Sequence, residues 1–548
     1  MGNSKKILIT AALPYVNNAP HLGNIIGCVL SADVYSRFTK NNKMDSVYIC
    51  GTDEYGTATE TEAKKLNISP IDLCDRNHEI HRKVYDWFDI KFDYFGRTSA
   101  EEHKKTVQMV FMQNYLNGNF MRKSMEQFYC GACSMFLADR FVKGACRHCG
   151  HADIDGDQCD ACGKLCTPEE LVDPYCATCR GSPTRKTTEH LFLDLHKFRE
   201  KLCEIPTANF SGIAARITRD WLRKGLEPRC MTRDLKWGVP VPEIAGSLED
   251  FGSKIFYVWF DAPIGYMTFT KQHLQHLDPF TKKGEWEVVQ FMGKDNVPFH
   301  TIIFPAVQLG TGTYTNVVSR LSSTEYLNFD GQKFSKSRGV GIFGTDLLGG
   351  EYGDCSVWRY CLLKLRPESS DSNFTLDGFR HTNNTLLNTF GNLCNRVLKF
   401  LLKNCGGAVS YREREEDREF IAENDRLFRE YRRLMENIEI KKSVDVFEKI
   451  CALANRRLQE SFDPQNKESK LATFHLSYSV IRNLAKVVEP LMPKIFSKLE
   501  SFIGEIANKE INGFEIFNEG KVYKVENLFT KFGEKDEEAF KKFGFKTT

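Results

Sequence analysis

The 548-residue sequence has no long hydrophobic run and no excess of charge of one sign. No stretch approaches the roughly eighteen consecutive apolar residues that a membrane helix needs, so we expect no membrane span. With 75 basic and 72 acidic residues the formal net charge is only +3, so any nucleic-acid surface must be a local patch. The length and the 41% hydrophobic fraction predict a soluble globular protein of three or four domains.

Targeting signals are also missing. The apolar stretch Ile7 to Leu13 follows directly after Lys6, which leaves no room for a signal or transit peptide. Lys6 stands where a myristoylation motif requires Ser or Thr. The C-terminal residues match no retention or prenylation signal. We therefore expect a cytoplasmic protein.

The 19 cysteines are not distributed as in a small disulfide-bonded secreted protein. Eight of them form four Cys-x-x-Cys pairs within residues 130–179, which indicates metal ligation in a reducing compartment. Four pairs can supply two zinc sites of four thiolates each. We expect structural rather than catalytic zinc, because four thiolates leave no ligand position open. Spacing alone does not decide which pairs share a site, and nearby Cys166 and His148 break the rhythm. The pairs are Cys130/Cys133, Cys146/Cys149, Cys159/Cys162 and Cys176/Cys179.

Two strand–turn–helix units open the chain. An apolar run over residues 6–13 ends at Pro14, and a helical pattern extends from Leu22 to about Thr39. A second run, Val47 to Cys50, leads into the turn 51–56 and another helical stretch. This alternation predicts a parallel α/β sheet.

The alternation breaks near residue 120 and returns later. Apolar α/β character reappears at Ile255 to Trp259 and at Val288 to Met292, with a helix after Asp295. We predict a doubly wound, Rossmann-like domain split by a zinc-knuckle insertion and followed by an α-helical bundle. The predicted limits are 1–118 and 241–320 for the two α/β halves, 119–240 for the insertion, 321–377 for a stem-contact region with the loop 333–337, and 378–548 for the helical domain. One helix face is indicated by Leu427, Phe428, Tyr431, Leu434, Met435 and Ile438.

The turn His21-Leu22-Gly23-Asn24, which we call the HLGN turn, stands where the first strand meets the first helix. Helix N-termini at this edge of a sheet favour anions. His21 and Asn24 lie three residues apart, so both can donate hydrogen bonds to phosphate oxygens from one face. Gly23 lacks a side chain, which lets a flat base or ribose approach the backbone. Ordinary helix capping is the alternative interpretation.

A second candidate phosphate site is the KFSKS loop, residues 333–337, within the basic stretch 332–339. Lys333, Lys336 and Arg338 surround Ser335 and Ser337. Nucleotidyl transfer is catalysed mainly by positive charge placed where negative charge develops. A solvated basic loop is the alternative, but two such motifs in this order favour ATP binding.

The HLGN turn and the KFSKS loop resemble the HIGH and KMSKS signatures of class I aminoacyl-tRNA synthetases. This sequence departs from them at Asn24 and at Phe334. Asn24 keeps a hydrogen-bond donor, and Phe334 replaces one apolar anchor by another, so we expect both roles to survive. The resemblance implies that His21, Asn24, Lys333 and Lys336 stabilise charge on the phosphates of ATP, which enters with Mg²⁺. Gly23, Ser335 and Ser337 are implied as further ATP-binding residues.

Three more stretches resemble methionyl-tRNA synthetases, most closely their eukaryotic and archaeal branch. They are residues 12–17, residues 256–267 and residues 291–295 with His300. A methionine side chain has to be selected by shape and by sulfur–aromatic contacts. The resemblance implies that Asp53 binds the substrate ammonium and that Arg233 lies near its carboxylate. The side-chain pocket it implies consists of Leu13, Tyr15, Trp259, Ala262, Pro263, Tyr266 and His300.

The family resemblance also assigns roles outside the α/β domain. It nests the inner cysteine pairs together and the outer pairs together, in a module that helps to admit the acceptor end of the tRNA. It implies that Asn392 and Arg396 read the anticodon, where an exposed polar helix face is the alternative. The family's usual Trp is missing, because no Trp follows Trp358; Phe462 is a candidate to stack in its place.

The sequence therefore predicts a methionine–tRNA ligase with ATP, L-methionine and tRNA(Met) as substrates, up to two zinc ions and no membrane partner. The absence of an appended tRNA-binding or dimerisation domain favours a monomer. Two alternatives stay open here. One is a class I synthetase for another small apolar amino acid, and the other is a non-catalytic, zinc-dependent RNA-binding protein.

Overall fold

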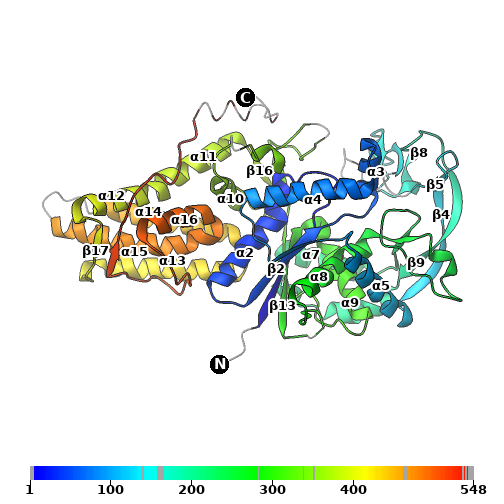
Figure 1. The fold of residues 1–548 in the computed structure, drawn as a ribbon, viewed down its shortest axis with the longest axis horizontal. Coiled ribbons are helices and arrows are strands. Elements are labelled where there is room, and N and C mark those ends of the chain that lie inside the picture. Colours follow the sequence, from blue (N-terminus) through cyan, green and yellow to red (C-terminus); the bar gives the residue numbers. More distant parts are fainter. Residues whose placement is uncertain are drawn as a thin grey trace.

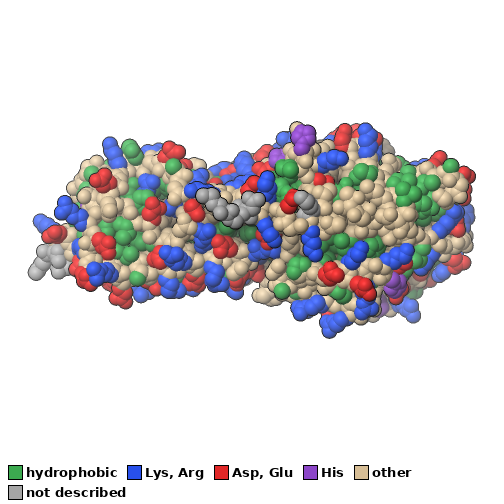
Figure 2. Space-filling model, turned by 90° about the horizontal axis from the view of Figure 1, so that it is seen from below, with side chains coloured by type: hydrophobic (Ala, Val, Ile, Leu, Met, Phe, Trp, Pro, Cys, Tyr) green, Lys and Arg blue, Asp and Glu red, His purple; other side chains and the backbone are tan. Residues whose placement is uncertain are grey.

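The computed structural model describes residues 5–137, 141–156, 159, 166–281, 283–336, 339–349, 352–460 and 467–533, with 536, 538, 540 and 543. The molecule is elongated, with an α/β half and a β-rich module at one end and a helical half at the other (Figure 1). On the face drawn in Figure 2, basic and acidic side chains are interspersed along both halves. None of the described helices combines the length and apolarity needed to cross a membrane.

A five-stranded sheet forms the centre of the α/β half, with strand order β14-β13-β1-β2-β3. Every neighbouring pair is parallel, which confirms the predicted parallel α/β sheet. Strand β1 pairs with β2 on one side and with β13 on the other, so the winding reverses there; doubly wound sheets bind ligands at the carboxyl edge of such a point. The strands are β1 (Lys6–Ala11), β2 (Ser46–Thr52), β3 (Tyr94–Arg97), β13 (Trp286–Gly293) and β14 (Arg320–Thr324).

Strand β1 is buried on both faces, as its continuous apolar run requires. Ile7 and Ile9 belong to one apolar cluster and Leu8 to another, because successive strand side chains point to opposite faces. Helices cover both faces of the sheet (Figure 1). They are α1 (Leu22–Asn24), the π-helical turn η1 (Ile25–Val29) and α2 (Leu30–Asn41), which form one continuous helix, and α3 (Thr57–Leu66), α4 (Pro70–Trp87), α5 (Glu101–Leu116), α8 (Val258–Leu274), the π-helical turn η8 (Phe299–Ile303) and α9 (Phe304–Gly310).

The inserted module is built on two antiparallel sheets. One has strand order β10-β9-β4-β5 and the other β7-β6-β8. The residues 255–259, expected to resume the α/β pattern, do not join the central sheet: Ile255 and Phe256 pair with Thr232 and Arg233 in a separate two-stranded sheet. The elements are β4 (Phe120–Cys130), β5 (Met135–Phe136), β6 (Val142–Ala145), β7 (Ile154–Asp155), β8 (Val172–Cys176), β9 (Thr184–Leu193), α6 (Arg199–Cys203), α7 (Gly212–Lys224), β10 (Arg229–Cys230), β11 (Thr232–Arg233) and β12 (Ile255–Phe256).

The second half is helical, as predicted. The apolar stripe of α13 is buried from Leu427 to Met435, whereas Ile438 lies beyond the end of the helix with a φ of 60°. The elements are β15 (Leu327–Phe329), α10 (Cys355–Lys364), β16 (Ser372–Phe374), α11 (Leu376–Leu386), the π-helical turn η10 (Leu387–Gly391), α12 (Asn392–Cys405), β17 (Ala408–Ser410), α13 (Arg418–Glu436), α14 (Ile440–Glu460), α15 (Lys467–Leu491), α16 (Pro493–Ile503) and β18 (Glu519–Lys521).

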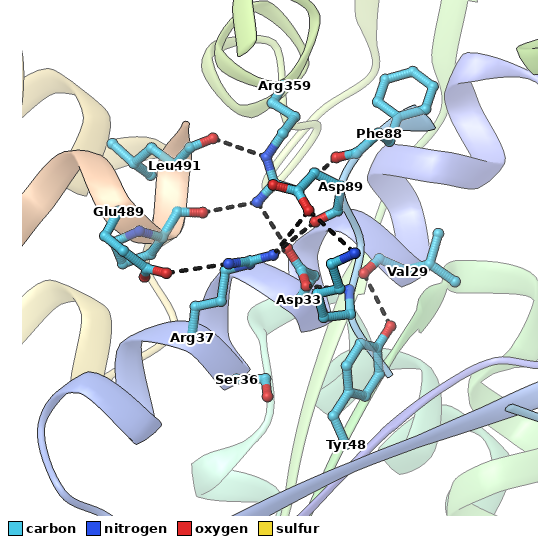
Figure 3. A network of polar contacts seen from close by, with 12 residues as sticks. Val29, Asp33, Ser36, Arg37, Tyr48, Phe88, Asp89, Arg359, Glu489 and Leu491 are labelled. Atoms are coloured by element: carbon cyan, nitrogen blue, oxygen red, sulfur yellow. Dashed lines mark hydrogen bonds and ion pairs between the residues drawn. The ribbon is translucent and has the colours of Figure 1, made fainter. Parts of the chain in front are cut away.

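Two arginines join the helical half to α2, the continuation of the helix that follows His21 (Figure 3). Arg359 of α10 donates to Asp33 Oδ2 at 2.7 Å and to the Leu491 carbonyl at 2.9 Å. Arg37 donates to Asp33 Oδ2 at 3.0 Å and to Glu489 Oε1 at 3.1 Å. The side chains of Asp33 and Arg359 are fully buried. Because buried charges are costly unless paired, this network fixes α2 against the end of α15.

Candidate active site

The HLGN turn is a capping box. Nδ1 of His21 accepts hydrogen bonds from the backbone N–H groups of Gly23 (3.1 Å) and Asn24 (3.3 Å), and Asn24 Oδ1 accepts from the His21 N–H (3.3 Å). Both side chains are therefore helix caps, as the alternative interpretation held. Burial lowers the pKa of His21 to about 4, so the ring is neutral at pH 7. Since Nδ1 accepts, the proton sits on Nε2, which is a donor for a ligand.

Gly23 has a structural role in addition to the expected approach of a base. A Cβ atom at this position would lie 3.0 Å from both Cε1 and Nδ1 of His21. The missing side chain makes room for the imidazole that caps the helix. The approach of a nucleotide base to this backbone stays a prediction.

The KFSKS loop docks directly on the HLGN turn. The ring of Phe334 stacks on His21 with 4.4 Å between centroids and 6° between planes. The chain then returns to the turn, because Leu22 N donates to the Ile342 carbonyl (3.4 Å) and Gly344 N donates to the Pro20 carbonyl (2.7 Å). The two predicted phosphate sites therefore form one structure at the carboxyl edge of β1.

The two lysines of this loop are exposed. Neither Lys333 nor Lys336 forms an ion pair with any residue that the structure describes, so no acidic side chain there compensates their charge. Two hydrogen bonds of 2.9 Å between the backbones of Ser335 and Val340 close the loop. Ser337 lies outside the described residues. Lys336 borders a cleft of about 670 Å³ whose walls also include Asn17, Asn18, Thr61, Lys64, Lys65, Phe141 and Lys143.

A small cavity of about 40 Å³ lies behind the loop that follows β1. Its lining includes the residues predicted for methionine binding, with the exception of Arg233. The lining residues are Ala12, Leu13, Tyr15, Asp53, Val258, Trp259, Ala262, Pro263, Tyr266, Asn296, Phe299 and His300. Four of these residues were not predicted from the sequence: Ala12, Val258, Asn296 and Phe299. Asn296 and Phe299 stand within one helical turn of His300, and that spacing is the signal that could have identified them.

The polar groups of Tyr266 and His300, at one end of this cavity, are hydrogen-bonded within the protein. His300 Nδ1 lies 2.8 Å from the Asn296 carbonyl, which can only accept, so Nδ1 carries a proton. Nε2 then accepts from the Tyr266 hydroxyl at 2.9 Å. Burial lowers the pKa of His300 to about 4. The ring is neutral, which suits a pocket for an uncharged side chain.

Asp53 is a buried carboxylate without a partner at one of its oxygens. Its backbone binds the loop after β1, through Pro14 O (2.9 Å) and Val16 N (3.2 Å). Only 3% of the residue is exposed, and Oδ1 has no hydrogen-bond partner among the described residues. Burial raises the pKa of Asp53 well above its usual range, and the neighbouring Asp261 and Glu54 add to this effect. Such a site strongly favours a cation.

Glu54 was not singled out from the sequence, although its contacts anchor the chain directly after Asp53. Arg97 donates to both of its carboxylate oxygens, at 2.8 and 3.1 Å. The backbone N–H of Glu54 donates to Thr98 Oγ1 (2.9 Å), and its carbonyl accepts from Trp237 Nε1 (2.7 Å). Two consecutive acids at the end of a buried strand were the available signal.

Arg233 is placed beside the cavity wall rather than in the cavity. Its guanidinium carbon lies 3.7 Å from the ring centroid of Tyr257, and Tyr257 in turn contacts Trp259 with 5.0 Å between centroids. The structure therefore brings Arg233 to the neighbourhood of the pocket, with one aromatic ring between.

The described cysteines of the four pairs form two groups, and the outer pairs meet as the resemblance implies. The outer pairs, Cys130/Cys133 and Cys176/Cys179, gather their four sulfurs within 4.8 Å of one another, and Cys146, Cys149 and Cys159 form a second group. Cys162 lies outside the described residues. The Sγ···Sγ distances are 3.4 Å for Cys130 and Cys179, 3.9 Å for Cys133 and Cys176, and 3.7 Å for Cys149 and Cys159.

These distances fit zinc, because a tetrahedral ion with Zn–S bonds of 2.3 Å separates its sulfurs by about 3.8 Å. The backbone N–H of Cys133 lowers the pKa of the Cys130 thiol to about 7, which favours the thiolate that metals bind. Cys166, which we expected not to bind metal, packs against the apolar cluster that contains Cys130, Cys146, Cys159 and Cys176.

All three π-helical turns in the described part of the chain lie at predicted sites. Turn η1 follows Asn24, η8 contains His300, and η10 directly precedes Asn392. Such turns are rare and are often found at functional sites. Asn392 is exposed and Arg396 is half-buried, and neither side chain has a hydrogen-bond or ion-pair partner among the described residues. Phe462 lies outside those residues.

Two family models match this chain. The model described as tRNA synthetases class I (M) matches residues 7–398, and the anticodon binding domain of methionyl tRNA ligase matches residues 407–547.

Related proteins match most of this chain. The probable cytoplasmic methionine–tRNA ligase of Encephalitozoon cuniculi is 49% identical over 500 residues, which cover 89% of each chain. The cytoplasmic methionine–tRNA ligase of Saccharomyces cerevisiae is 41% identical over 97% of this chain and 72% of that protein. Among solved structures, the methionyl-tRNA synthetase of Mycobacterium tuberculosis in complex with methionyl-adenylate has a TM-score of 0.78 at 20% identity, and the match covers 96% of this chain and 99% of that one. That likeness concerns the fold.

Proposed function

Because the chain belongs to the methionyl-tRNA synthetase family of class I synthetases, we propose that it is a methionine–tRNA ligase that activates L-methionine with ATP and transfers it to tRNA(Met). In the first step the carboxylate of methionine attacks the α-phosphate and pyrophosphate leaves. In the second, a hydroxyl of the terminal adenosine takes the methionyl group and AMP leaves. The names of the relatives agree with the cytoplasmic location expected from the sequence.

The observation that carries this proposal is the docking of the KFSKS loop on His21. Lys333 and Lys336 are exposed there without acidic partners among the described residues, and His21 is a neutral donor through Nε2. A triphosphate entering with Mg²⁺ supplies the missing negative charge. Because a carboxylate is already nucleophilic, the first step needs no general base, and the protein acts by positioning and electrostatics.

For methionine, the buried carboxylate of Asp53 supports binding of the substrate ammonium. The apolar cavity beside it ends at the neutral Tyr266–His300 pair, which suits a thioether. Arg233 is our proposed contact for the substrate carboxylate, and reaching it requires Tyr257 to yield, because the guanidinium now stacks on that ring.

The remaining assignments follow the family. The eight cysteines of the knuckles would hold structural zinc and so stabilise the module beside the cleft that Lys336 borders. Asn392 and Arg396, exposed or half-buried on α12, would contact the anticodon. The domain limits and a monomeric state are parts of the same proposal.

ATP–pyrophosphate exchange tests the function directly. The purified full-length chain should exchange label only when L-methionine is present in a panel of amino acids, and it should then aminoacylate tRNA(Met). Exchange driven by a different amino acid would point to another class I specificity. Tight tRNA binding without any exchange would point to a non-catalytic RNA-binding protein.

A further inference from the structure

The ring of Tyr326 makes cation–π contacts with two lysines next to the proposed active site. It stands in the short connection between β14 and β15. Lys294 Nζ lies 3.9 Å from its ring centroid and Lys333 Nζ lies 5.5 Å from it. Lys333 belongs to the KFSKS loop, and its neighbour Phe334 is the residue that stacks on His21.

Tyr326 is held by hydrogen bonds at its hydroxyl and at both polar groups of its backbone. The Tyr326 hydroxyl donates to both carboxylate oxygens of Asp295, at 2.8 and 2.9 Å. Its backbone N–H donates to Asp371 Oδ1 (3.0 Å), and its carbonyl accepts from Ser372 N (3.0 Å). The phenol also donates to a carboxylate, which increases the electron density of the ring and hence its attraction for a cation.

The two lysines differ in how their charge is compensated. Lys294 forms an ion pair with Glu325 and lies 3.9 Å from Asp371. Lys333 has no acidic partner among the described residues, and the Tyr326 ring is the contact that holds its ammonium. An aromatic face attracts a cation without neutralising it. A carboxylate in the same place would bind Lys333 more firmly and would repel the phosphates.

We propose that Tyr326 is a positioning residue for Lys333, which holds the ammonium beside the phosphate site and stays beneath it when MgATP binds. This inference rests on the proposed function, in which Lys333 binds the phosphates. The lysine has three N–H groups, so it can face the ring and a phosphate oxygen together. Preorganisation of this kind reduces the entropy lost when ATP is bound.

The test is a double-mutant cycle in ATP–pyrophosphate exchange with the full-length chain. Tyr326→Leu removes the ring and should lower kcat/KM for ATP about two- to fivefold, while KM for methionine is unchanged. Tyr326→Phe keeps the ring and should stay within about twofold of the wild type. In the Lys333→Ala background, Tyr326→Leu should cause no further loss, whereas in the Lys336→Ala background it should cause its full loss.

An equal loss from Tyr326→Leu with and without Lys333 would overturn the proposal, and so would a gain in ATP affinity. If Tyr326→Leu does not fold, phenylalanine analogues with one, two or three fluorines at position 326 preserve the shape. Their kcat/KM for ATP should fall stepwise as fluorine depletes the ring face, and a flat series would contradict the proposal. Absence of exchange in the wild type would instead refute the proposed function.

Discussion

The imidazole of His21 and the phenyl ring of Phe334 stack face to face, with 4.4 Å between centroids and 6° between planes. His21 begins the helix that continues into α2, and Phe334 belongs to the KFSKS loop. Nδ1 already accepts from the helix N-terminus, so the stack orients Nε2, the one ring nitrogen left to donate to a ligand. Phe334 therefore orients the His21 side chain, for which we propose a catalytic role, and does more than anchor the loop.

The first prediction concerns that stack. Phe334→Ala should lower kcat/KM for ATP about three- to tenfold, because an aromatic pair and its buried area are lost. Phe334→Met should remain within about twofold of the wild type, because a thioether also packs well on an aromatic ring. Pyrophosphate exchange at varied ATP concentration measures both. Equal losses in the two variants would show that the stack itself is required.

Lys336→Ala should reduce adenylate formation about 10²- to 10³-fold, since a cation that stabilises the phosphates in the transition state is removed. The KM for methionine should change little. Pyrophosphate exchange is the measurement, and Lys364→Ala is a matched control, because Lys364 is partly exposed and paired with Glu448 away from the loop. Near-normal exchange by the Lys336 variant would contradict the assigned mechanism.

Asp53→Asn should weaken methionine binding and stabilise the unliganded fold. The KM for methionine should rise about 10²- to 10³-fold, because a buried partner of the ammonium is lost. The unliganded variant should be more stable than the wild type at pH 7 by about 1–3 kcal/mol, because a buried carboxylate with an unpaired oxygen is costly. Calorimetry and exchange kinetics test the two halves separately.

The pH dependence of that gain has a definite sign. The folded-state pKa of Asp53 is raised above its unfolded value, so the wild type loses stability from this group as the pH rises above the ordinary carboxyl range. Asparagine does not titrate. The stability gain of the variant should therefore grow with pH and vanish in acid, where Asp53 is protonated in both states. A gain that is constant from acid to neutral pH would exclude this explanation.

Cys130→Ser should remove about one zinc ion per chain, because a four-thiolate site loses a ligand. Aminoacylation of tRNA should fall more than pyrophosphate exchange, since the module lies beside the cleft and outside the α/β sheet. Metal analysis by mass spectrometry and the two activity assays decide this. Cys203→Ser, at an exposed cysteine outside both groups, should leave the zinc content unchanged.

Arg396→Ala should lower kcat/KM for tRNA about 10- to 100-fold, in line with the loss of one stacked base contact. Pyrophosphate exchange should be unaffected, because α12 lies in the helical half. Lys403→Ala, at an exposed position on the same helix, is the control for a general loss of positive charge. If both variants lose aminoacylation equally, Arg396 has no specific role in recognition.

The sequence by itself determined the elements and the chemistry. The runs of apolar residues and the turn residues between them located β1, β2 and β13. Residue type and spacing identified His21, the KFSKS lysines and the cysteine pairs. These features are local, so they can be read from neighbours in the chain. The sequence placed Ile255 to Trp259 less well, because a short apolar run is compatible with a strand or with the start of a helix.

Only the tertiary structure decided how distant segments meet. Phe334 stacks on His21, Tyr326 lies under Lys333, and Arg97 binds Glu54 next to Asp53. No local pattern shows that these side chains meet. These contacts depend on the order in which parallel strands are placed in the sheet, which brings the ends of β1, β2, β13 and β14 to one edge. Packing also set the protonation of His21 and Asp53, because their pKa values follow from burial, and burial is a property of the folded chain.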